Sequence, residues 1–289
     1  MKFNHMDNNI SVKIAVATHK QYRMPDDEMY VPFLAGAAIR DEDFGYMRDD
    51  CIEDNISDKN PNFSELTVLY EAVRVLDAEY IGLAHYRRHF AGKKFSTFDN
   101  IFMNKEDSRF ANVLTYKELE TLIPHNRIIL PKKRNYRVET IFSHYAHTHG
   151  EGHLLVAREV ISRLCREYLR SFDRVMKSHS AYMFNMMIMR KELTESYCDW
   201  LFPVLFELEK TLTESGMTEN LSEFDARLYG RVSERLFNVW LDRMIVTGEI
   251  GEDEIAELPF VYMEKVDIAK KAISFANAKL FGKKYSKSF

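Results

Sequence analysis

Four polar side chains end an apolar run between Asp77 and Phe90, and together they could bind an anion. The apolar residues stop at His85, which Tyr86, Arg87 and Arg88 follow. Two adjacent guanidinium groups repel each other unless something negative lies beside them, and the planar fork of arginine fits phosphate or carboxylate. The simpler alternative is that both arginines pair with acidic side chains of the protein. This tetrad therefore predicts an anion site, with ordinary ion pairs as the alternative.

A second polar segment covers residues 54–65 and precedes the apolar run. Its side chains both donate and accept hydrogen bonds and include one cation, which suits a polyhydroxylated ligand. The candidates for binding sugar or phosphate are Asn55, Ser57, Lys59, Asn60 and Glu65. The alternative is a solvated loop in which such side chains satisfy turns.

Four of the ten histidines, His144, His147, His149 and His153, lie within ten residues. They could ligate a transition metal, but their spacing does not match a hydrolytic zinc motif such as His-Glu-x-x-His. Polar positioning in a cleft is the favoured interpretation, and a metal-dependent hydrolase built on this cluster is a third functional candidate. Histidine could also act as an acid or a base, because its ordinary pKa of about 6.5 lies near neutrality.

Acidic residues on a late helical segment are candidates for a general base. Glu223, Asp225 and Glu234 lie on or beside this segment, and we select Glu234 or Asp225. The alternative is that they are ordinary surface groups. A base must come within hydrogen-bond reach of the proton that it removes.

The length and the cysteine content narrow the class of protein. The 289 residues are enough for one large domain or for a domain with an appended subdomain. Three cysteines without close spacing fit a reducing compartment. Residues 1–10 lack a signal-peptide hydrophobic region, and no stretch offers about 20 continuous apolar residues. We therefore expect a cytoplasmic protein.

The charge is distributed unevenly along the chain. The formal net charge is -4, but residues 264–289 hold seven lysines and two acidic residues. The acidic remainder argues against nonspecific nucleic-acid binding. Within residues 266–281, apolar positions recur at helical spacing, which predicts a basic amphipathic helix. Such a helix can lie on the inner face of an anionic membrane, although packing on the domain with the lysines in solvent is equally compatible.

The elements that would position these groups alternate between strand and helix. A helix over 65–76 leads into a strand that ends at His85, where ligands sit in open α/β sheets. Residues 95–112 lack periodicity and could be a flexible excursion, and 49–62 reads as a loop. The other predicted strands cover 13–18, 127–131 and 182–189, and the other predicted helices cover 116–122, 152–175, 192–212 and 222–241. This order predicts an α/β fold with one mixed sheet and a helical C-terminal third.

Several segments together resemble a bacterial capsular and exopolysaccharide biosynthesis family of glycosyltransferases, first catalogued as a domain of unknown function. The similarity extends over about residues 12–245. The matching segments are 15–20 (Ala-Val-Ala-Thr-His-Lys), 55–67 (Asn-Ile-Ser to Thr), 80–88 (ending His-Tyr-Arg-Arg), 129–134, 184–185 (Phe-Asn) and 233–236 (Ser-Glu-Arg-Leu). The resemblance implies a GT-A-like domain over 1–245, with 246–289 as a C-terminal extension.

The resemblance also implies an activity. It is the transfer of a hexose, with galactose in pyranose or furanose form as one candidate, from a nucleotide sugar such as a UDP-sugar to a lipid-linked polysaccharide precursor. Thr18, His19 and Lys20 would then meet the nucleotide. His85 and Tyr86 would bind phosphate with Arg87 and Arg88, and Asn185 would lie near the sugar. A noncatalytic nucleotide-sugar-binding module of a polysaccharide assembly complex is the alternative.

One departure from the GT-A pattern concerns the metal. GT-A enzymes commonly hold a divalent cation with an Asp-x-Asp strand end, and here His85 to Arg88 stand at the equivalent place. Residues 41–43 match as letters but read as a loop. We therefore predict no metal ligands and no cofactor, with Mn²⁺ or Mg²⁺ left open, and we hypothesise that the two arginines neutralise the leaving diphosphate.

Overall fold

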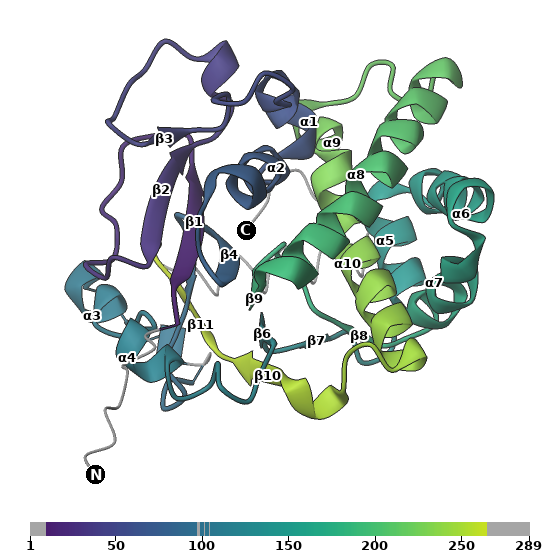
Figure 1. The fold of residues 1–289 in the computed structure, drawn as a ribbon. Coiled ribbons are helices and arrows are strands. Elements are labelled where there is room, and N and C mark those ends of the chain that lie inside the picture. The colour runs from purple at the N-terminus through teal and green to yellow at the C-terminus, as the bar shows by residue number, and fades with distance from the viewer. Residues whose placement is uncertain (1–9, 97–98, 101, 104, 265–289) are drawn as a thin grey trace.

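A mixed sheet of nine strands forms the centre of the part of the chain that the computed structural model describes, residues 10–96, 99–100, 102–103 and 105–264 (Figure 1). Its main path has the order β10-β6-β9-β4-β1-β2-β3, and β5 joins β4 to β11. The strands are β1 (Val12–Thr18), β2 (Tyr30–Leu34), β3 (Met47–Arg48), β4 (Tyr80–His85), β5 (Arg88–Phe90), β6 (Ile128–Pro131), β9 (Met187–Arg190), β10 (Ile255–Leu258) and β11 (Phe260–Tyr262). A separate pair consists of β7 (Arg134–Asn135) and β8 (Ser180–Ala181).

Parallel pairing places the ends of β1 and β4 at one edge of the sheet. Strand β1 runs parallel to both β2 and β4, and Ala17 lies opposite His85. Strand β9 runs antiparallel to β4 and β6. Because parallel strands end on the same side, the residues after Thr18 and after His85 meet there.

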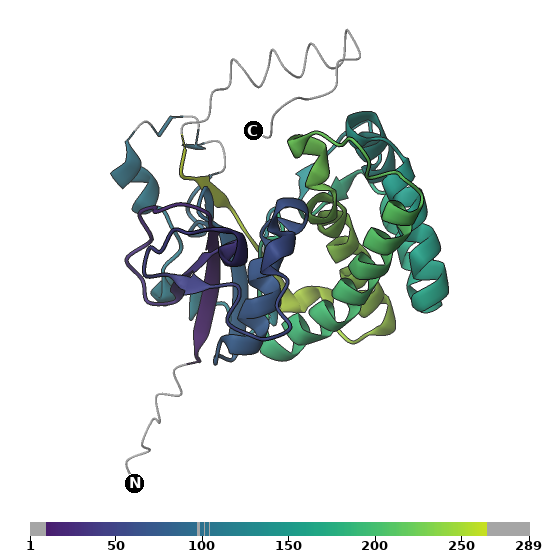
Figure 2. The same cartoon turned by 90° about the horizontal axis from the view of Figure 1, so that it is seen from above.

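Both faces of the sheet are covered by a hydrophobic core. Successive side chains of a strand point to opposite faces, so each strand contributes to both cores. Ala15 and Ala17 face one hydrophobic core, whereas Ile14 and Val16 face the other. The first core contains the longer helices of residues 141–247. Figure 2 shows these teal and green helices gathered on one side of the purple strand β1.

The helices confirm the predicted helical C-terminal third. They are α1 (Asn60–Phe63), α2 (Leu66–Val75), α3 (Glu106–Phe110), α4 (Tyr116–Leu119), α5 (Ile141–His149), α6 (Gly152–Leu164), α7 (Leu169–Met176), α8 (Lys191–Glu214), α9 (Glu223–Ala226) and α10 (Leu228–Thr247). Two predicted helices are each divided in the structure. The helix predicted over 152–175 breaks at Cys165 (φ -150°, ψ 61°), and the one predicted over 222–241 breaks at Arg227.

The strand predicted over 182–189 is wrong in its first half. Phe184 and Asn185 have positive φ angles of 80° and 50°, which an extended strand does not permit. The backbone of Tyr182 pairs instead with the side chain of Asn238. Asn185 therefore lies in a turn before β9 rather than within a strand.

Two segments predicted as irregular are packed into the fold. The loop predicted over 49–62 holds two fully buried polar residues, Asp49 and Ser57, and ends within α1. In the segment 95–112, the buried Arg109 donates to the carbonyl oxygens of Tyr262 and Glu264 at 2.6 and 2.8 Å. Hydrogen bonds to β11 therefore fix a segment that the sequence indicated could be flexible.

The segment after residue 245 contributes to the same sheet. Strand β10 pairs in parallel with β6, and β11 pairs with β5. The division of the chain at residue 245 stays a prediction, and the amphipathic helix predicted over 266–281 lies outside the described residues. Among the described helices, none is long and apolar enough to cross a membrane.

Candidate functional site

The tetrad forms a tight turn at the carboxyl edge of the sheet. The backbone N–H of Tyr86 donates to the carbonyl of Ala17 at 3.1 Å, which ties the end of β4 to β1. The N–H of Arg87 donates to Nδ1 of His85 at 3.2 Å. Arg88 does not extend into solvent after the strand, because it begins β5 and pairs back with His85. The apolar run thus ends in a turn with the two arginines on its second limb.

Neither arginine makes an ion pair with any residue that the structure describes. The guanidinium carbon of Arg88 lies 3.7 Å from the ring centroid of Phe184 and 5.2 Å from that of Tyr262. Its Nε is buried without a hydrogen-bond partner, and burial lowers the pKa of Arg88. Arg87 lies half-buried, 5.4 Å from the ring of Tyr86. Neither positive charge is therefore neutralised by a direct ion pair, although the charges of Glu234 and Glu65 act on Arg88.

The histidines of this edge are neutral because of their surroundings. Burial, followed by the charges of Arg87 and Arg88, holds the pKa of His85 well below its ordinary value of 6.5. Because Nδ1 of His85 accepts from Arg87, its proton belongs on Nε2. Burial and then the charge of Arg40 lower the pKa of His19. Burial is thus the main reason that both histidines are neutral, and the neighbouring arginines add to it.

Aromatic rings support the predicted nucleotide residues. The buried ring of Tyr86 contacts His19 and Tyr22 edge-on, with centroids 5.3 and 5.0 Å apart. The ammonium of Lys20 lies 5.0 Å from the Tyr86 centroid and 4.0 Å from a carboxylate oxygen of Glu264. His19 and Lys20 are exposed.

Thr18 is the buried member of the three residues predicted to meet the nucleotide. Its hydroxyl donates to the carbonyl of Lys20 at 2.8 Å and accepts from the N–H of the same residue at 3.3 Å. Thr18 therefore shapes the turn, whereas its two neighbours present their side chains to solvent.

The polar residues of 54–60 bond to the protein itself. The hydroxyl of Ser57 donates to Asp49 and accepts from the N–H of Ala38 at 3.0 Å. Asp49 in turn accepts from the N–H groups of Gly36 and Ala37 at 2.8 and 2.9 Å. This set of bonds fixes the chain that follows β2.

The remaining polar residues of this segment also have protein partners. Asn55 donates to the carbonyl of Ile52 at 2.8 Å, and Lys59 forms an ion pair with Glu209 at 2.8 Å. Asn60 donates to the carbonyl of Ser64 at 2.9 Å. In this structure, these three side chains therefore stabilise the protein itself by bonding to other parts of the chain.

Glu65 and Asn185 meet near the arginines. The side-chain amide of Asn185 donates to Glu65 Oε1 at 2.7 Å and to the carbonyl of Gly230 at 3.0 Å, and its oxygen accepts from Ser233 at 2.9 Å. Burial raises the pKa of Glu65, and the hydrogen bond from Asn185 opposes this effect. The charge of Glu65 also acts on Arg88, so the pair borders the cationic edge.

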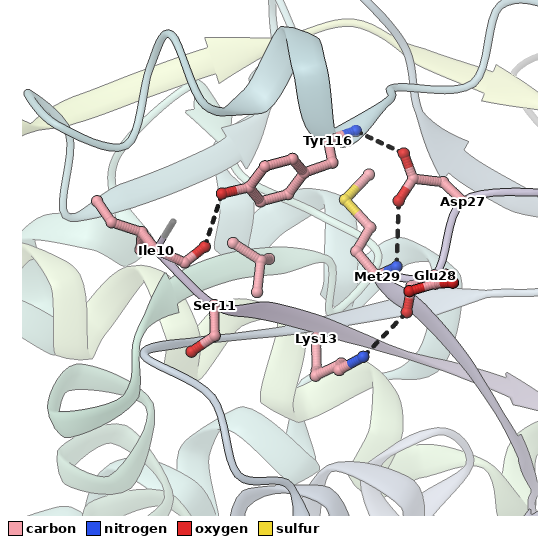
Figure 3. Close-up of a pocket in the computed structure, with 8 residues that line it drawn as sticks. Ile10, Ser11, Lys13, Asp27, Glu28, Met29 and Tyr116 are labelled. Atoms are coloured by element: carbon pink, nitrogen blue, oxygen red, sulfur yellow. Dashed lines mark hydrogen bonds between the residues drawn. The ribbon is translucent and has the colours of Figure 1, made fainter. Parts of the chain in front are cut away.

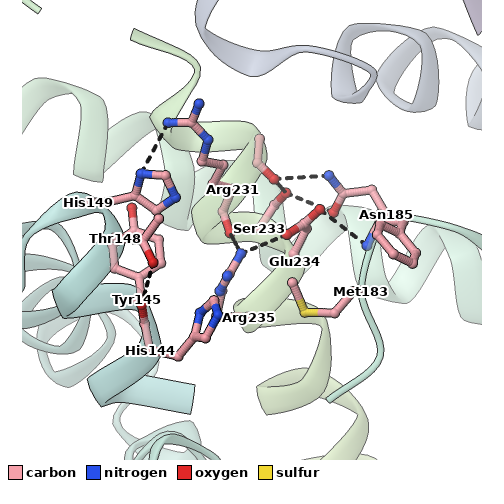
Figure 4. A network of polar contacts seen from close by, with 12 residues as sticks. His144, Tyr145, Thr148, His149, Met183, Asn185, Arg231, Ser233, Glu234 and Arg235 are labelled. Carbon is pink, nitrogen blue, oxygen red and sulfur yellow. Dashed lines mark hydrogen bonds and ion pairs between the residues drawn. The ribbon is translucent and has the colours of Figure 1, made fainter. Parts of the chain in front are cut away.

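The two candidate bases differ in how firmly they are held. Glu234 accepts from the N–H of Phe184 at 3.2 Å and forms an ion pair with Arg235 at 2.6 Å (Figure 4). Asp225 is half-buried and accepts a hydrogen bond from the hydroxyl of Ser222 at 2.7 Å.

The histidine cluster lies on α5 and at the start of α6, separately bonded. His147 pairs with Glu139 at 2.7 Å, and Tyr145 contacts Nδ1 of His153 at 3.1 Å. His149 contacts Arg231 at 3.4 Å (Figure 4), and burial, followed by the charge of Arg231, lowers its pKa to about 3. Burial lowers the pKa of His144 to about 4. Within the described ranges, no three His, Cys, Asp or Glu side chains are placed to hold a metal.

Sequence reasoning missed a third arginine of the site. Arg227 lies half-buried at the break between α9 and α10, and its Nε donates to Ser64 Oγ at 3.2 Å. After burial and the larger effects of other cationic side chains, its charge also lowers the pKa values of His19 and His85. The sequence did hold a signal for it, because arginine occurs at positions 227, 231 and 235. Residues at this spacing lie on one face of a helix.

A pocket of about 480 Å³ lies at the opposite end of β1 (Figure 3). Some of its polar groups bond to the protein itself, because Tyr116 donates from its hydroxyl to the carbonyl of Ile10 at 2.9 Å and from its N–H to Asp27 at 2.7 Å. None of the predicted site residues lines this pocket.

This sheet, with the long helices on one side, defines a glycosyltransferase-like fold. The chain is similar to the solved structure titled "WbbM bifunctional glycosytransferase apo structure", with a TM-score of 0.76 and 27% sequence identity. The match covers 87% of this chain and 45% of that chain, so this chain spans less than half of the length of its structural relative.

The chain belongs to the family described as "Domain of unknown function (DUF4422)", whose model matches residues 13–244. The resemblance to a family first catalogued as a domain of unknown function is confirmed to that extent. The part that concerns capsular and exopolysaccharide synthesis stays a prediction. No curated protein matches the chain.

Proposed function

We propose that the protein is a glycosyltransferase that moves a hexose from a nucleotide sugar, most simply a UDP-sugar, to a lipid-linked precursor of a capsular or extracellular polysaccharide. The fold and the relationship to a bifunctional glycosyltransferase support this class of reaction. The observation that carries the proposal is the pair Arg87 and Arg88, which lie at the carboxyl edge of the sheet and form no direct ion pair with any described residue.

The arginines would act on the leaving group. When the bond between the sugar and the phosphate oxygen breaks, negative charge develops on the nucleoside diphosphate. Guanidinium groups that are already in place stabilise this charge more than they stabilise the donor. His19 and Lys20 would contact the nucleotide beside Tyr86, and Asn185 would orient the sugar together with Glu65.

Asp225 is the better candidate for the base. A base must be able to take a proton from the acceptor hydroxyl. The ion pair with Arg235 and the hydrogen bond from Phe184 occupy both carboxylate oxygens of Glu234. Asp225 accepts from the hydroxyl of Ser222 through one oxygen, Oδ2, which leaves the other oxygen to approach an acceptor hydroxyl.

The residues at this edge do not fit a divalent metal. Mn²⁺ and Mg²⁺ prefer oxygen ligands, whereas β4 ends in a histidine, a tyrosine and two arginines. The loop 41–43, the one Asp-x-Asp by letters, is exposed and irregular. We therefore propose that the arginines take the place that a metal has in other GT-A enzymes.

The test is donor turnover by the full-length protein. Purified protein should release UDP from a UDP-hexose, by transfer to a lipid-linked acceptor or slowly to water, and Arg87→Ala should abolish the release. Arg137→Ala, which removes an exposed arginine of another part of the chain, is the matched control. Donor binding without any release by the wild-type protein would instead favour the noncatalytic binding module.

The basic segment after Glu264 is proposed to hold the enzyme at the inner face of an anionic membrane. Its lysines support this idea, since each Lys near such a surface contributes about 1 kcal/mol. Glu264 lies beside Lys20, so the segment continues from the edge that carries the site. A protein lacking residues 265–289 should lose binding to anionic vesicles and keep donor binding. Equal vesicle binding by both proteins would contradict the idea.

A further inference from the structure

We infer that Arg227 is a third residue that binds the donor. Together with Arg87 and Arg88, it binds the diphosphate of the donor from the side opposite β4. This inference rests on the proposed function and narrows the donor to a nucleoside diphosphate sugar. Two phosphate groups offer enough oxygens for three guanidinium groups, each of which donates in a planar fork.

The first argument is the absence of an ion pair. Arg227 is half-buried, and among the described residues it makes no ion pair. Its Nε donates to a neutral hydroxyl, that of Ser64 at 3.2 Å, which leaves the terminal nitrogens to other partners. The buried carboxyl of Glu65 lies next to this edge but forms no ion pair with any of the three arginines, so their mutual repulsion is only partly offset, and a bound anion removes it.

The second argument is the set of contacts that connects Arg227 with the other two arginines. Arg87 and Arg88 come from the β4–β5 turn, and Arg227 comes from the junction of α9 with α10. Arg227 donates to Ser64, and Asn185 donates at 2.7 Å to Glu65, the residue after Ser64. Phe184, which precedes Asn185, lies with its ring centroid 3.7 Å from the guanidinium carbon of Arg88. These contacts place Arg227 beside the edge that carries Arg88.

The third argument is the structure that holds Arg227. Ser64 has φ 55° and ψ -135°, a conformation that costs about 1–3 kcal/mol for a residue other than glycine. Its carbonyl accepts from Asn60 at 2.9 Å and from Thr67 at 3.2 Å, so these side chains stabilise the strained residue. The segment predicted to surround the ligand is thus better explained as the support of the arginine that binds it.

Close packing of α10 on this support completes the arrangement. A Cβ atom at Gly230 would lie 3.1 Å from both Cβ and Oγ of Ser64 and 3.2 Å from the carbonyl oxygen of Phe63. Glycine therefore lets α10 approach α1 closely enough for the side chain of Arg227 to reach Ser64. The strain at Ser64 and the small residue at 230 both serve to position one guanidinium.

Calorimetric titration of the full-length protein with UDP, inorganic pyrophosphate and uridine tests the inference. Arg227→Gln should weaken the affinity for UDP and for pyrophosphate by about tenfold or more, the size expected for lost charge-assisted hydrogen bonds. The affinity for uridine should be unchanged. Arg227→Lys should fall between, because it keeps the charge and loses the fork. Ser64→Ala should give a smaller loss in the same direction.

Arg243→Gln, near the other end of α10, is the control for the helix, and thermal unfolding reports whether each variant is folded. UDP binding that is equal in wild type and Arg227→Gln would overturn the inference and leave the proposed function intact. An equal loss of affinity for uridine in Arg227→Gln would show that Arg227 has only a structural role, and this result would also overturn the inference. If the wild-type protein binds neither UDP nor pyrophosphate, the inference and the proposed function both fail.

Discussion

The side chain of Asn185 donates to Glu65 Oε1 at 2.7 Å, so the turn before β9 is bonded to the residue that precedes α2. The two residues are far apart in the sequence, and the positive φ of Asn185 directs its amide toward Glu65 and Gly230. The contact joins the sheet edge to the helical part of the molecule. It also buries a carboxyl group next to the cationic edge, which has a consequence for stability.

Glu65→Gln should become more stable relative to the wild type as the pH rises. Burial raises the folded-state pKa of Glu65 above its ordinary value of 4.5. Between these two pKa values the folded protein keeps a proton that the unfolded chain has released, so the free energy of unfolding of the wild type falls with pH. Glutamine does not titrate and can still accept from Asn185.

Urea unfolding at pH 4.5 and pH 7 measures this difference, and Glu223→Gln is the control because Glu223 is exposed. A stability difference between Glu65→Gln and the wild type that is the same at both pH values would contradict the account of Glu65.

His89→Leu should stabilise the protein and reduce its sensitivity to acid. Burial lowers the pKa of His89 to about 3, and neither ring nitrogen has a hydrogen-bond partner. Below pH 6.5 the unfolded chain binds a proton at this histidine, whereas the folded protein does not. Between pH 7 and pH 5 this difference lowers the free energy of unfolding by about 2 kcal/mol. Denaturant unfolding at both pH values should show the wild type losing more stability than His89→Leu by about this amount. Parallel losses would refute the prediction.

Arg109→Leu should release β11. The buried guanidinium of Arg109 donates to the carbonyls of Tyr262 and Glu264, and its removal leaves both acceptors without these bonds. We expect a loss of about 3 kcal/mol in the free energy of unfolding, as for lost hydrogen bonds to a charged group. Hydrogen exchange should rise in β11 and remain unchanged in β6. Uniform exchange changes in both strands would argue against a local role.

Donor turnover should not require a divalent metal. If Arg87 and Arg88 neutralise the leaving diphosphate, activity should persist at full rate in excess EDTA. The measurement is UDP release with and without chelator, followed by addition of Mn²⁺ or Mg²⁺. Complete loss in EDTA with recovery on addition of metal would contradict the proposed electrostatic role.

The strands that were predicted correctly are those with local signals. Strands β1, β4 and β6 are apolar runs that end in polar residues, and α4 begins at Tyr116, the first residue of the helix predicted over 116–122. Strand β2 was missed because Pro32 lies within it, opposite Val16 of β1. Proline ordinarily argues against a sheet position, since it cannot donate a hydrogen bond.

The site was predicted in its residue types but not in its contacts. The tetrad of His85 to Arg88 could be recognised from the sequence because its four residues are consecutive. The packing of Arg88 on Phe184 and Tyr262 depends on residues distant in sequence, and the reach of Arg227 to Ser64 depends on a helix break and a strained backbone. Local patterns carry no information about such contacts.

The central claim is that Arg87 and Arg88 bind the diphosphate of a nucleotide sugar and stabilise it as it leaves. Its most direct test is single-turnover UDP release from a UDP-hexose by the wild type and by Arg87→Ala, Arg88→Ala and Arg137→Ala. The account predicts that the first two variants lose at least about a hundredfold in rate, as for removal of a group that stabilises transition-state charge, and that Arg137→Ala keeps the wild-type rate. Wild-type rates in Arg87→Ala and Arg88→Ala would contradict it.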